Sequence, residues 1–268
     1  MPIHPTAVVD SRAQIDPSAD IGPYAIVGPD VQIGARTRVL AHACIVGFTI
    51  IGADNEIHTG AAVGTAPQHL AYKGAPVHTI IGDHNIIREY ASINGSFVEG
   101  SRTVIGSDNY LMIQSHVGHD CIVGNRIVLC NGSLLSGHVE VEDRAFISGL
   151  VAVHQFTRVG ELVMCAGITR VNRDVPPYMM VYGDSEVVGL NVVGLRRAGI
   201  SAAARAEIGL AYEILFEQRR SLPSAIAALK SEPRCPEVQH IIAFLEKSKR
   251  GICGGRRFAR GGEPSAEA

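Results

Sequence analysis

The chain has 268 residues, of which 46% are hydrophobic and only 5% aromatic, with no tryptophan. The formal net charge is −2, and the part from Ser185 onward is only mildly basic, with 13 Lys and Arg against 9 Asp and Glu, which argues against a nucleic-acid-binding protein. No apolar run approaches the roughly 18 residues of a membrane span, and the start at Met1 lacks the features of a signal peptide. These properties predict a cytoplasmic protein without an integral membrane segment.

An aliphatic residue recurs at every sixth position from Ile3 to Val171. Of the 29 positions on this grid, 25 are Ile, Val or Leu. A period of six fits neither an α-helix nor a coiled coil, and it differs from the alternation of an ordinary strand. We therefore predict a mainly β fold, a parallel β-helix in which three hexads form a triangular coil and coils stack about 4.8 Å apart. The repeat leaves the hand of this β-helix open.

The repeat is interrupted twice without losing its phase. Residues 65–79 and 94–103 lack the aliphatic pattern, and we interpret both as loops that leave the β-helix. Coiling should stop near Pro176-Pro177, because proline cannot continue a regular ladder. The predicted β-helix domain therefore spans residues 1–184.

The period changes to that of helices in the C-terminal part. Ser201 is a suitable N-cap for the first helix, and two more are expected at about 222–232 and 236–249. We predict a C-terminal helical domain over residues 185–252. Residues 253–268 are rich in Gly and Arg, which predicts a disordered tail.

Histidines gather where the repeat is most regular. The segment Ser115-His116-Val117-Gly118-His119-Asp120-Cys121 is followed by Ser136-Gly137-His138 and later by His154-Gln155. Residues 18 apart should stack on neighbouring coils, so Gly137 lies above His119 and His138 above Asp120. Three separate segments thus meet on one edge of the prism, within about 10 Å of each other.

Two kinds of chemistry use converging imidazoles. Zinc sites need several ligands, but His116 and His119 are three residues apart, whereas two of the three ligands in hexapeptide-repeat carbonic anhydrases are five apart. Base catalysis needs one imidazole, an acid that orients it and a donor for an oxyanion. His119, Asp120 and the Gly137 N–H provide that set. We therefore predict base catalysis without a metal, with a metal-dependent enzyme and a non-catalytic scaffold as lesser alternatives.

Several motifs together resemble the UDP-N-acetylglucosamine acyltransferases of lipid A biosynthesis, over nearly the whole chain from Ile3 to about Ile252. They are His116-x-x-His119-Asp120-Cys121, Gly137-His138-Val139, Ala152-Val153-His154-Gln155-Phe156, Asp174-Val175-Pro176-Pro177-Tyr178 and Asn191-x-x-Gly194-Leu195-x-Arg197. The resemblance implies a left-handed parallel β-helix and a cytoplasmic homotrimer. It implies transfer of a 3-hydroxyacyl chain from the 4′-phosphopantetheine of acyl carrier protein to the sugar 3-hydroxyl of UDP-N-acetylglucosamine, the first step of lipid A biosynthesis, with no bound cofactor.

The resemblance also implies roles for single residues. His119 would be the general base, Asp120 would orient its ring, and the Gly137 N–H would face the oxyanion. Gly167 falls where family members set the length of the acyl chain, and the basic C-terminal helices would receive the acidic carrier protein. Residues expected to contact the substrates are His116, His138, His154, Gln155, Gln68, Asn191 and Arg197.

Some positions around the nucleotide sugar depart from the family pattern. His69 and Ala71 stand where an acid and a lysine are common, and Val193 stands at a commonly acidic position. The arginine of a common Thr-Ile-x-Arg-Gly-Thr segment is missing from residues 92–96. Because some family members acylate a 3-amino analogue of the sugar, N-acyl transfer to a UDP 3-amino sugar is the alternative reaction.

Overall fold

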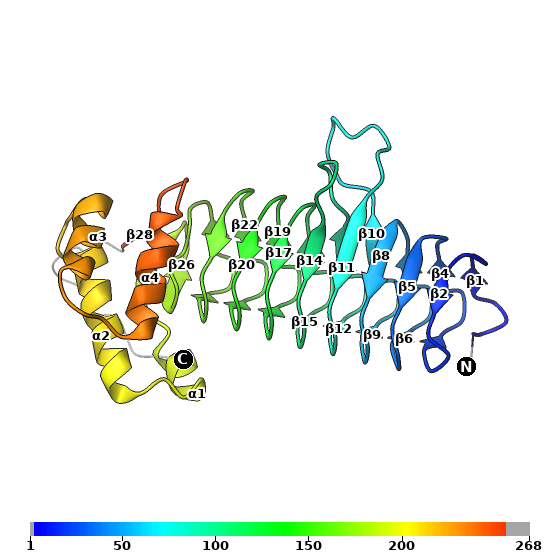
Figure 1. Cartoon of the computed structure of the whole chain (residues 1–268), viewed down its shortest axis with the longest axis horizontal. Helices are drawn as coiled ribbons and strands as arrows, with labels where there is room; N and C mark the ends of the chain where they lie inside the picture. The colour runs from blue at the N-terminus through cyan, green and yellow to red at the C-terminus, as the bar shows by residue number, and fades with distance from the viewer. Residues whose placement is uncertain (1–2, 256–268) are drawn as a thin grey trace.

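The computed structural model describes residues 3–255, which form a long prism followed by a group of helices (Figure 1). The prism has three sheets of short strands, and from Val8 to Val171 consecutive strands of the chain lie in different sheets. Over the same residues, neighbouring strands within each sheet pair in parallel along the prism, as in His116↔Leu134 and Val128↔Phe146. This arrangement confirms the predicted parallel β-helix.

The strands fall into the three sheets as follows. The first sheet contains β1 (Val8–Val9), β4 (Ile26–Val27), β7 (Cys44–Ile45), β10 (Ala62–Thr65), β13 (Ser92–Asn94), β16 (His116–Val117), β19 (Leu134–Leu135), β22 (Ala152–Val153) and β25 (Arg170–Val171). The second contains β2 (Gln14–Ile15), β5 (Val31–Ile33), β8 (Phe48–Ile51), β11 (His78–Ile81), β14 (Thr103–Ile105), β17 (Ile122–Val123), β20 (Glu140–Val141) and β23 (Arg158–Val159). The third contains β3 (Asp20–Ile21), β6 (Arg38–Val39), β9 (Glu56–Ile57), β12 (Ile86–Ile87), β15 (Tyr110–Leu111), β18 (Val128–Leu129), β21 (Phe146–Ile147), β24 (Met164–Cys165), β26 (Met179–Tyr182), β27 (Glu186–Leu190) and β28 (Gly254–Gly255).

The core of the prism consists of the aliphatic residues of the six-residue repeat. Leu111, Val117 and Val123 belong to successive strands of one coil, and each is at most 1% exposed. Each strand turns one side chain inward and the next outward, so a single aliphatic per hexad fills the interior. Complete burial of such a side chain contributes about 1.5–3 kcal/mol relative to exposure, and the contribution recurs on every face of every coil.

Two loops project from the same edge of the prism (Figure 1). One joins β10 to β11 and the other joins β13 to β14. Paired positions on the flanking coils are 30 and 24 residues apart, compared with 18 between the other coils up to β25. These separations are all multiples of six, so the aliphatic residue of each hexad still faces inward after both insertions.

A ladder of buried asparagines holds the coils together at these insertions. Asn55, Asn85 and Asn109 stack at one corner and are each at most 1% exposed. Asn85 Nδ2 donates to Asn55 Oδ1 at 2.9 Å and to Gly106 O at 3.0 Å. The Asn85 Oδ1 accepts from the Asn109 N–H at 3.0 Å. The ladder therefore satisfies buried backbone groups across both of the long coil connections.

The C-terminal part contains α1 (Val192–Arg197), α2 (Ala202–Tyr212), a π-helical turn η1 (Glu213–Glu217), α3 (Leu222–Lys230) and α4 (Pro236–Glu246). The Ser201 side chain caps α2 as predicted, accepting from the Ala204 N–H at 3.1 Å. Among residues 3–255 there is no helix of the length and apolarity required to cross a bilayer.

The expected domain boundaries differ from the structure in two places. The boundary after residue 184 falls within the turn of an antiparallel hairpin, β26–β27, which extends the third sheet beyond the last complete coil. Cys253 is fully buried and its N–H donates to Asp174 O at 2.8 Å, so the ordered chain continues past residue 252. A long-range backbone contact of this kind leaves no local signal in the sequence. The rest of the expected tail, residues 256–268, lies outside the described residues.

Helix α4 docks on the β-helix through a charged network around His240. Its Nε2 lies 2.9 Å from Glu142 Oε2, and its Nδ1 lies 3.2 Å from Glu161 Oε2. Hydrogen bonds with both carboxylates raise the pKa of His240 to about 9. The bond from His240 is also the largest effect that lowers the pKa of Glu161 to about 2. A cationic imidazole therefore ties α4 to the last coils at neutral pH.

We expect Asn85→Ala to lower the free energy of unfolding by about 1–3 kcal/mol, because it leaves buried polar groups of the ladder without partners. Chemical denaturation followed by circular dichroism measures this change. Asn131→Ala, at an exposed position, is the matched control and should stay within about 0.5 kcal/mol of the wild type. Equal stability of the two variants would contradict a supporting role for the ladder.

The docking of α4 should weaken at high pH. Because the pKa of His240 is raised in the folded state, its stabilisation is fully present below the ordinary value of 6.5 and is lost as the pH rises through about 9. The difference in melting temperature between the wild type and His240→Gln should therefore be largest near pH 6 and small near pH 10. Thermal unfolding across this range measures it. A difference that does not change with pH would refute the assignment of a cationic His240.

Candidate active site

The predicted histidine and aspartate lie at the corner between the first and second sheets, after β16. His119 Nδ1 and Asp120 Oδ2 are 2.7 Å apart, and both residues are 9% exposed. Asp120 has a φ of 58°, in the left-handed region that bulky residues rarely adopt. This corner conformation turns the carboxylate back toward the imidazole of the preceding residue.

The Asp120 carboxylate is held in its ionised form by donors from the second loop. Its Oδ2 accepts from the Phe97 N–H at 2.9 Å, and its Oδ1 accepts from the Ser101 hydroxyl. Burial opposes ionisation, but the hydrogen bonds from Ser101, His119 and Phe97 outweigh it, so the pKa of Asp120 is lowered. An ionised carboxylate can only accept, which places a hydrogen on His119 Nδ1 and leaves a lone pair on Nε2. This is the tautomer that a general base requires.

Gly137 lies directly against the imidazole, one coil further along. A Cβ built on Gly137 would be 2.5 Å from His119 Nε2, so only glycine fits beside the ring in this position. Among residues 3–255 the Gly137 N–H donates no hydrogen bond to another backbone group, so it is available as a donor. The structure thus confirms the predicted stacking of Gly137 on His119.

Three aromatic rings surround the His119 imidazole. His138 and Phe97 approach it edge-on, with ring centroids at 5.1 and 5.6 Å, and His69 does so at 5.6 Å. His69 from the first loop stacks on Phe97 from the second loop at 4.1 Å. His138 is also 3.8 Å from Asp120 Oδ2 through its Nε2. Both projecting loops therefore fold onto the His119 corner and restrict the positions that its ring can take.

His116 and His138 are held as neutral imidazoles. Burial is the main cause that lowers the pKa of His116, with a smaller contribution from His119. Its Nδ1 lies 2.8 Å from the Ser92 hydroxyl. Burial also lowers the pKa of His138, although the nearby Asp120 works in the opposite direction. The site thus presents neutral, polar rings to a substrate.

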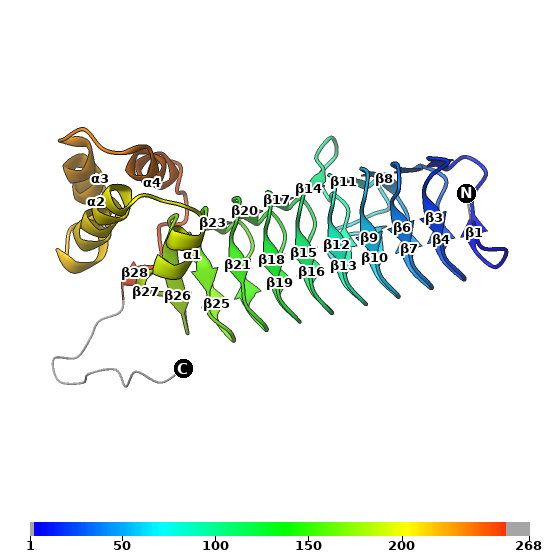
Figure 2. The ribbon, with the colours of Figure 1, turned by 90° about the horizontal axis from the view of Figure 1, so that it is seen from below.

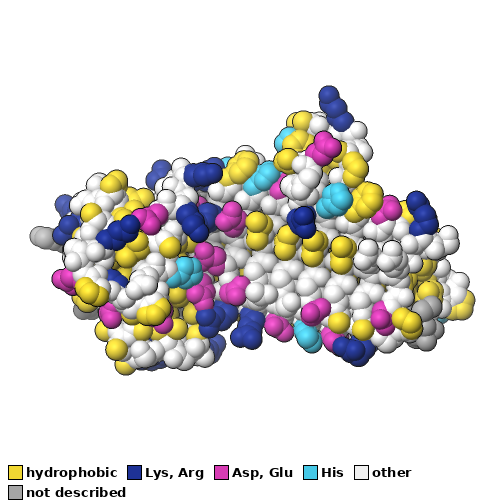
Figure 3. Space-filling view, viewed as in Figure 1, with side chains coloured by type: hydrophobic (Ala, Val, Ile, Leu, Met, Phe, Trp, Pro, Cys, Tyr) yellow, Lys and Arg dark blue, Asp and Glu magenta, His cyan; other side chains and the backbone are white. Residues whose placement is uncertain are grey.

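Other predicted residues on this edge are open to solvent. His154, Gln155 and Gln68 are exposed, and His154 Nδ1 lies 3.1 Å from Gln155 O. Histidine side chains collect along the upper edge of the face in Figure 3, beside the projecting loops. These three side chains are therefore free to meet solvent, whereas the His119–Asp120 pair is buried.

The remaining predicted residues lie toward the C-terminal end of the prism. Asn191 caps α1, since its Oδ1 accepts from the Gly194 N–H and its Nδ2 donates to Leu162 O, both at 2.9 Å. Arg197 is exposed in the last turn of α1. Gly167 is exposed, and an added Cβ there would have only an ordinary contact of 3.6 Å. Figure 2 shows α1 beside the final strands, well beyond β16, so within one chain Asn191 and Arg197 are apart from His119.

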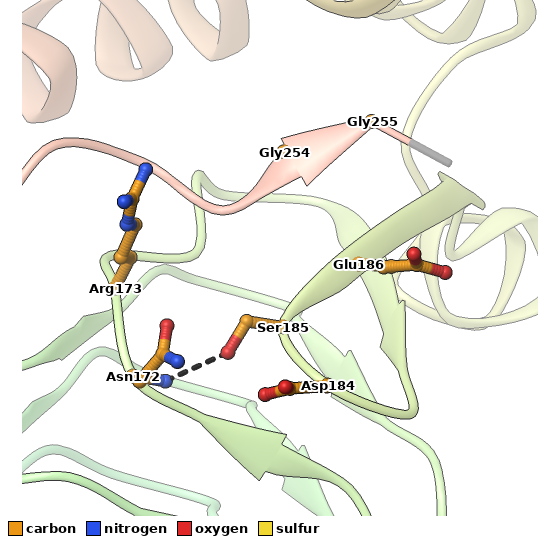
Figure 4. A pocket seen from close by; sticks show the side chains of 7 residues that line it. All are labelled: Asn172, Arg173, Asp184, Ser185, Glu186, Gly254 and Gly255. Atoms are coloured by element: carbon orange, nitrogen blue, oxygen red, sulfur yellow. Dashed lines mark hydrogen bonds between the residues drawn. The ribbon is translucent and has the colours of Figure 1, made fainter. Parts of the chain in front are cut away.

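A pocket of about 380 Å³ opens at the same end of the molecule (Figure 4). It contains none of the predicted site residues, and Asp184 on its wall is paired with Arg170 at 2.8 Å. Its lining residues are Asn172, Arg173, Asp184, Ser185, Glu186, Gly254 and Gly255. The chemistry at the His119 corner therefore takes precedence over this pocket as the candidate active site.

Sequence reasoning singled out His69 but not its contact with His119, and it missed the other loop residues that complete the corner. Phe97 and Ser101 contact Asp120, and His69 contacts the His119 ring, but the loops lack the repeat that would give them a register. The Thr103 hydroxyl, which accepts from the Asp120 N–H at 2.8 Å, was also missed. The sequence offered one signal for these contacts. The second loop lies just before the histidine segment in the chain and keeps the six-residue phase, which places it close to the His119 corner.

A buried histidine oriented by an ionised aspartate, beside a backbone donor, can remove a proton from a hydroxyl or amine and stabilise the oxyanion of an acyl transfer. On a β-helix of six-residue repeats, this site defines a hexapeptide-repeat acyltransferase.

The comparisons with known proteins agree with this class. Residues 174–253 match the family model described as "Udp N-acetylglucosamine O-acyltransferase; Domain 2". The acyl-[acyl-carrier-protein]--UDP-N-acetylglucosamine O-acyltransferase of Gloeothece citriformis is 46% identical over 92% of this chain and 90% of its own length. That of an Anaeromyxobacter species is also 46% identical, over 94% and 99%.

Solved structures are similar over almost the whole chain. LpxA from Acinetobacter baumannii has a TM-score of 0.91 at 40% identity and covers 93% of this chain and 98% of its own. UDP-N-acetylglucosamine acyltransferase from Campylobacter jejuni has a TM-score of 0.89 at 33% identity, with coverage of 94% and 99%. The chain belongs to the UDP-N-acetylglucosamine O-acyltransferase family.

We expect Gly137→Ala to lower the rate of acyl transfer by about 10²-fold, because the new methyl group would displace the His119 ring from its catalytic position. Steady-state kinetics measure the loss, and circular dichroism checks the fold. Gly149→Ala is the matched control on the same β-helix, since its Cβ would have a contact of 3.5 Å. Wild-type activity in Gly137→Ala would show that the ring position is not critical.

Proposed function

We propose that this chain transfers a 3-hydroxyacyl group from acyl carrier protein to the 3-hydroxyl of UDP-N-acetylglucosamine, the first step of lipid A biosynthesis. The observation that carries the proposal is the buried His119–Asp120 pair with the Gly137 backbone against the ring. It is supported by relatives whose printed names state an acyl-carrier-protein-dependent transfer to UDP-N-acetylglucosamine.

The reaction follows from the positions of these groups. His119 Nε2 takes the proton of the sugar hydroxyl as its oxygen attacks the thioester carbonyl. The resulting imidazolium is stabilised by Asp120, and the tetrahedral oxyanion accepts a hydrogen bond from the Gly137 N–H. Collapse of this intermediate breaks the carbon–sulfur bond. The departing pantetheine thiolate then receives the proton from His119, which restores the base.

The substrates need contacts beyond the base. We assign His116, His138, His154, Gln155 and Gln68 to the sugar and acyl path along the open edge. Asn191 and Arg197 contact nucleotide or pantetheine groups, and Gly167 leaves room for a longer acyl chain. The acyl chain arrives on the 4′-phosphopantetheine of the carrier protein, and no bound cofactor is required.

The partners follow from the same architecture. Exposed arginines at the end of α1, Arg196 and Arg197, give the C-terminal part a basic surface for the acidic carrier protein. We propose a cytoplasmic homotrimer, because a threefold arrangement would bring the C-terminal contacts of one copy near the His119 corner of another.

N-acyl transfer to a UDP 3-amino sugar is the second candidate. The observation that favours it is the position of His69, which lies against Phe97 and His119 at the acceptor side of the site. Ala71, two residues later, is exposed. An imidazole at position 69 offers less negative charge to the ammonium form of an amino sugar than a carboxylate at this position would. The acceptor would then react as a neutral amine, by the same base mechanism.

The test is the rate of acyl transfer from a 3-hydroxyacyl carrier protein to UDP-N-acetylglucosamine and to its 3-amino analogue. We expect the hydroxyl acceptor to be preferred, and we expect His119→Ala to lower kcat/KM with it by about 10²–10⁴-fold through loss of the base. Mass spectrometry of the products measures both effects.

His84→Ala is the matched control, because His84 also lies between two carboxylates, at 3.6 Å from Asp54 and 4.0 Å from Asp108, but at an exposed corner. It should keep wild-type rates. A preference for the amine would establish the second candidate, and transfer to neither acceptor would overturn both.

A further inference from the structure

His119, Asp120 and His138 form a compact set of three potential metal ligands. One donor atom from each residue lies within 4.8 Å of the other two. Two imidazole nitrogens and one carboxylate oxygen are the donors that zinc sites with an open fourth position use. The set is held by the backbone, because His138 lies one coil beyond Asp120 and its N–H donates to His119 O at 2.9 Å.

We propose that this triad binds a single Zn²⁺ ion reversibly and that the ion inhibits the enzyme. The ion is an inhibitor and not a cofactor of the transfer. The binding half of the proposal stands on geometry alone, whereas the inhibition half rests on the proposed function.

The Asp120 carboxylate decides which nitrogen of His119 is the ligand. Asp120 Oδ2 lies on the Nδ1 side of the ring, at 2.7 Å, and His138 Nε2 is 3.8 Å from the same oxygen. Zinc bonds of about 2.0–2.2 Å in a tetrahedron require donors roughly 3.3 Å apart. The His119–Asp120 pair must therefore open by about half an ångström and the His138–Asp120 pair must close by a similar amount. The donors of His119 and His138 start within 4.8 Å of each other and must also close to this spacing, which rotation of the partly exposed His138 side chain provides.

The surroundings favour an ion at this point. The Phe97 N–H and the Ser101 hydroxyl continue to orient the carboxylate after the ion replaces the His119 proton. An entry path exists past His138, whose side chain is 27% exposed compared with 11% and 5% for the other two.

Inhibition follows from the tautomer that the ion imposes. In the free enzyme the ring hydrogen is on His119 Nδ1, and the Nε2 lone pair is the base. Zn²⁺ on Nδ1 displaces that hydrogen to solvent or to Nε2, and a neutral imidazole bound through Nδ1 carries its hydrogen on Nε2. The nitrogen that should accept the sugar proton is then already protonated, so the base is lost.

The test is calorimetric titration of the full-length, chelator-treated protein with ZnCl₂, in the absence of substrates. We expect one Zn²⁺ per chain. His138→Gln should weaken binding by on the order of 10²-fold, since a direct ligand matters at least as much as an outer-shell partner. His84→Gln, which alters another histidine flanked by two carboxylates, should bind as the wild type does.

A parallel assay follows acyl transfer as Zn²⁺ is added and then removed with EDTA. We expect inhibition at the concentration that fills the calorimetric site, and full recovery after chelation. The metal site would be overturned if His138→Gln bound Zn²⁺ as tightly as the wild type. It would also be overturned if only His84→Gln lost affinity. Undiminished transfer by the Zn²⁺-loaded protein would overturn the inhibition. If the metal-free protein has no transfer activity while the binding pattern holds, the proposed function fails and the metal site stands.

Discussion

The structure depends on stacking of each coil on the one before it, with one buried aliphatic side chain per hexad. Parallel pairing fixes the register of each strand, because a shift of one residue would turn every core side chain to solvent. The positions of the outward-facing residues are fixed by the same register. Ile122 pairs with Glu140, for example, and their inward neighbours Val123 and Val141 are at most 3% exposed. Alignment of functional groups along the prism is therefore a consequence of core packing, and no separate interaction is needed to bring the three histidine segments together.

The corners of the prism supply the conformations that the chemistry uses. Non-glycine residues with positive φ occupy the corners repeatedly, and Asp120, His138 and Phe156 are three such residues in one column. Left-handed backbone of this kind costs free energy, and the cooperative stacking of many coils sustains it. At the active corner it has a chemical use, since it directs a carboxylate at the ring of the residue before it. Gly137, which lacks a side chain, leaves the space that this ring fills.

The two insertions turn an open corner into an enclosed site. Phe97 and Ser101 provide hydrogen bonds to Asp120, and the stack of His69 on Phe97 joins the loops over His119. These contacts keep the acid ionised and the imidazole in one tautomer. They also place the His69 imidazole edge-on to the His119 ring. The His119–Asp120 pair comes from the regular coils, whereas the groups that cover it come from the two insertions.

The sequence alone determined the β-helix, the phase of its core, the Ser201 cap and the convergence of His119, Asp120, Gly137 and His138, because a strict period converts sequence separation directly into spatial position. It did not determine the contacts of Phe97, Ser101 and His69, since residues in the insertions have no register with the coils. It also missed the hairpin β26–β27, which follows the end of the six-residue repeat, and the pairing of β28 with β27, which joins segments distant in the chain. Only the tertiary structure decided these features, because they depend on side-chain and backbone partners that no local pattern encodes.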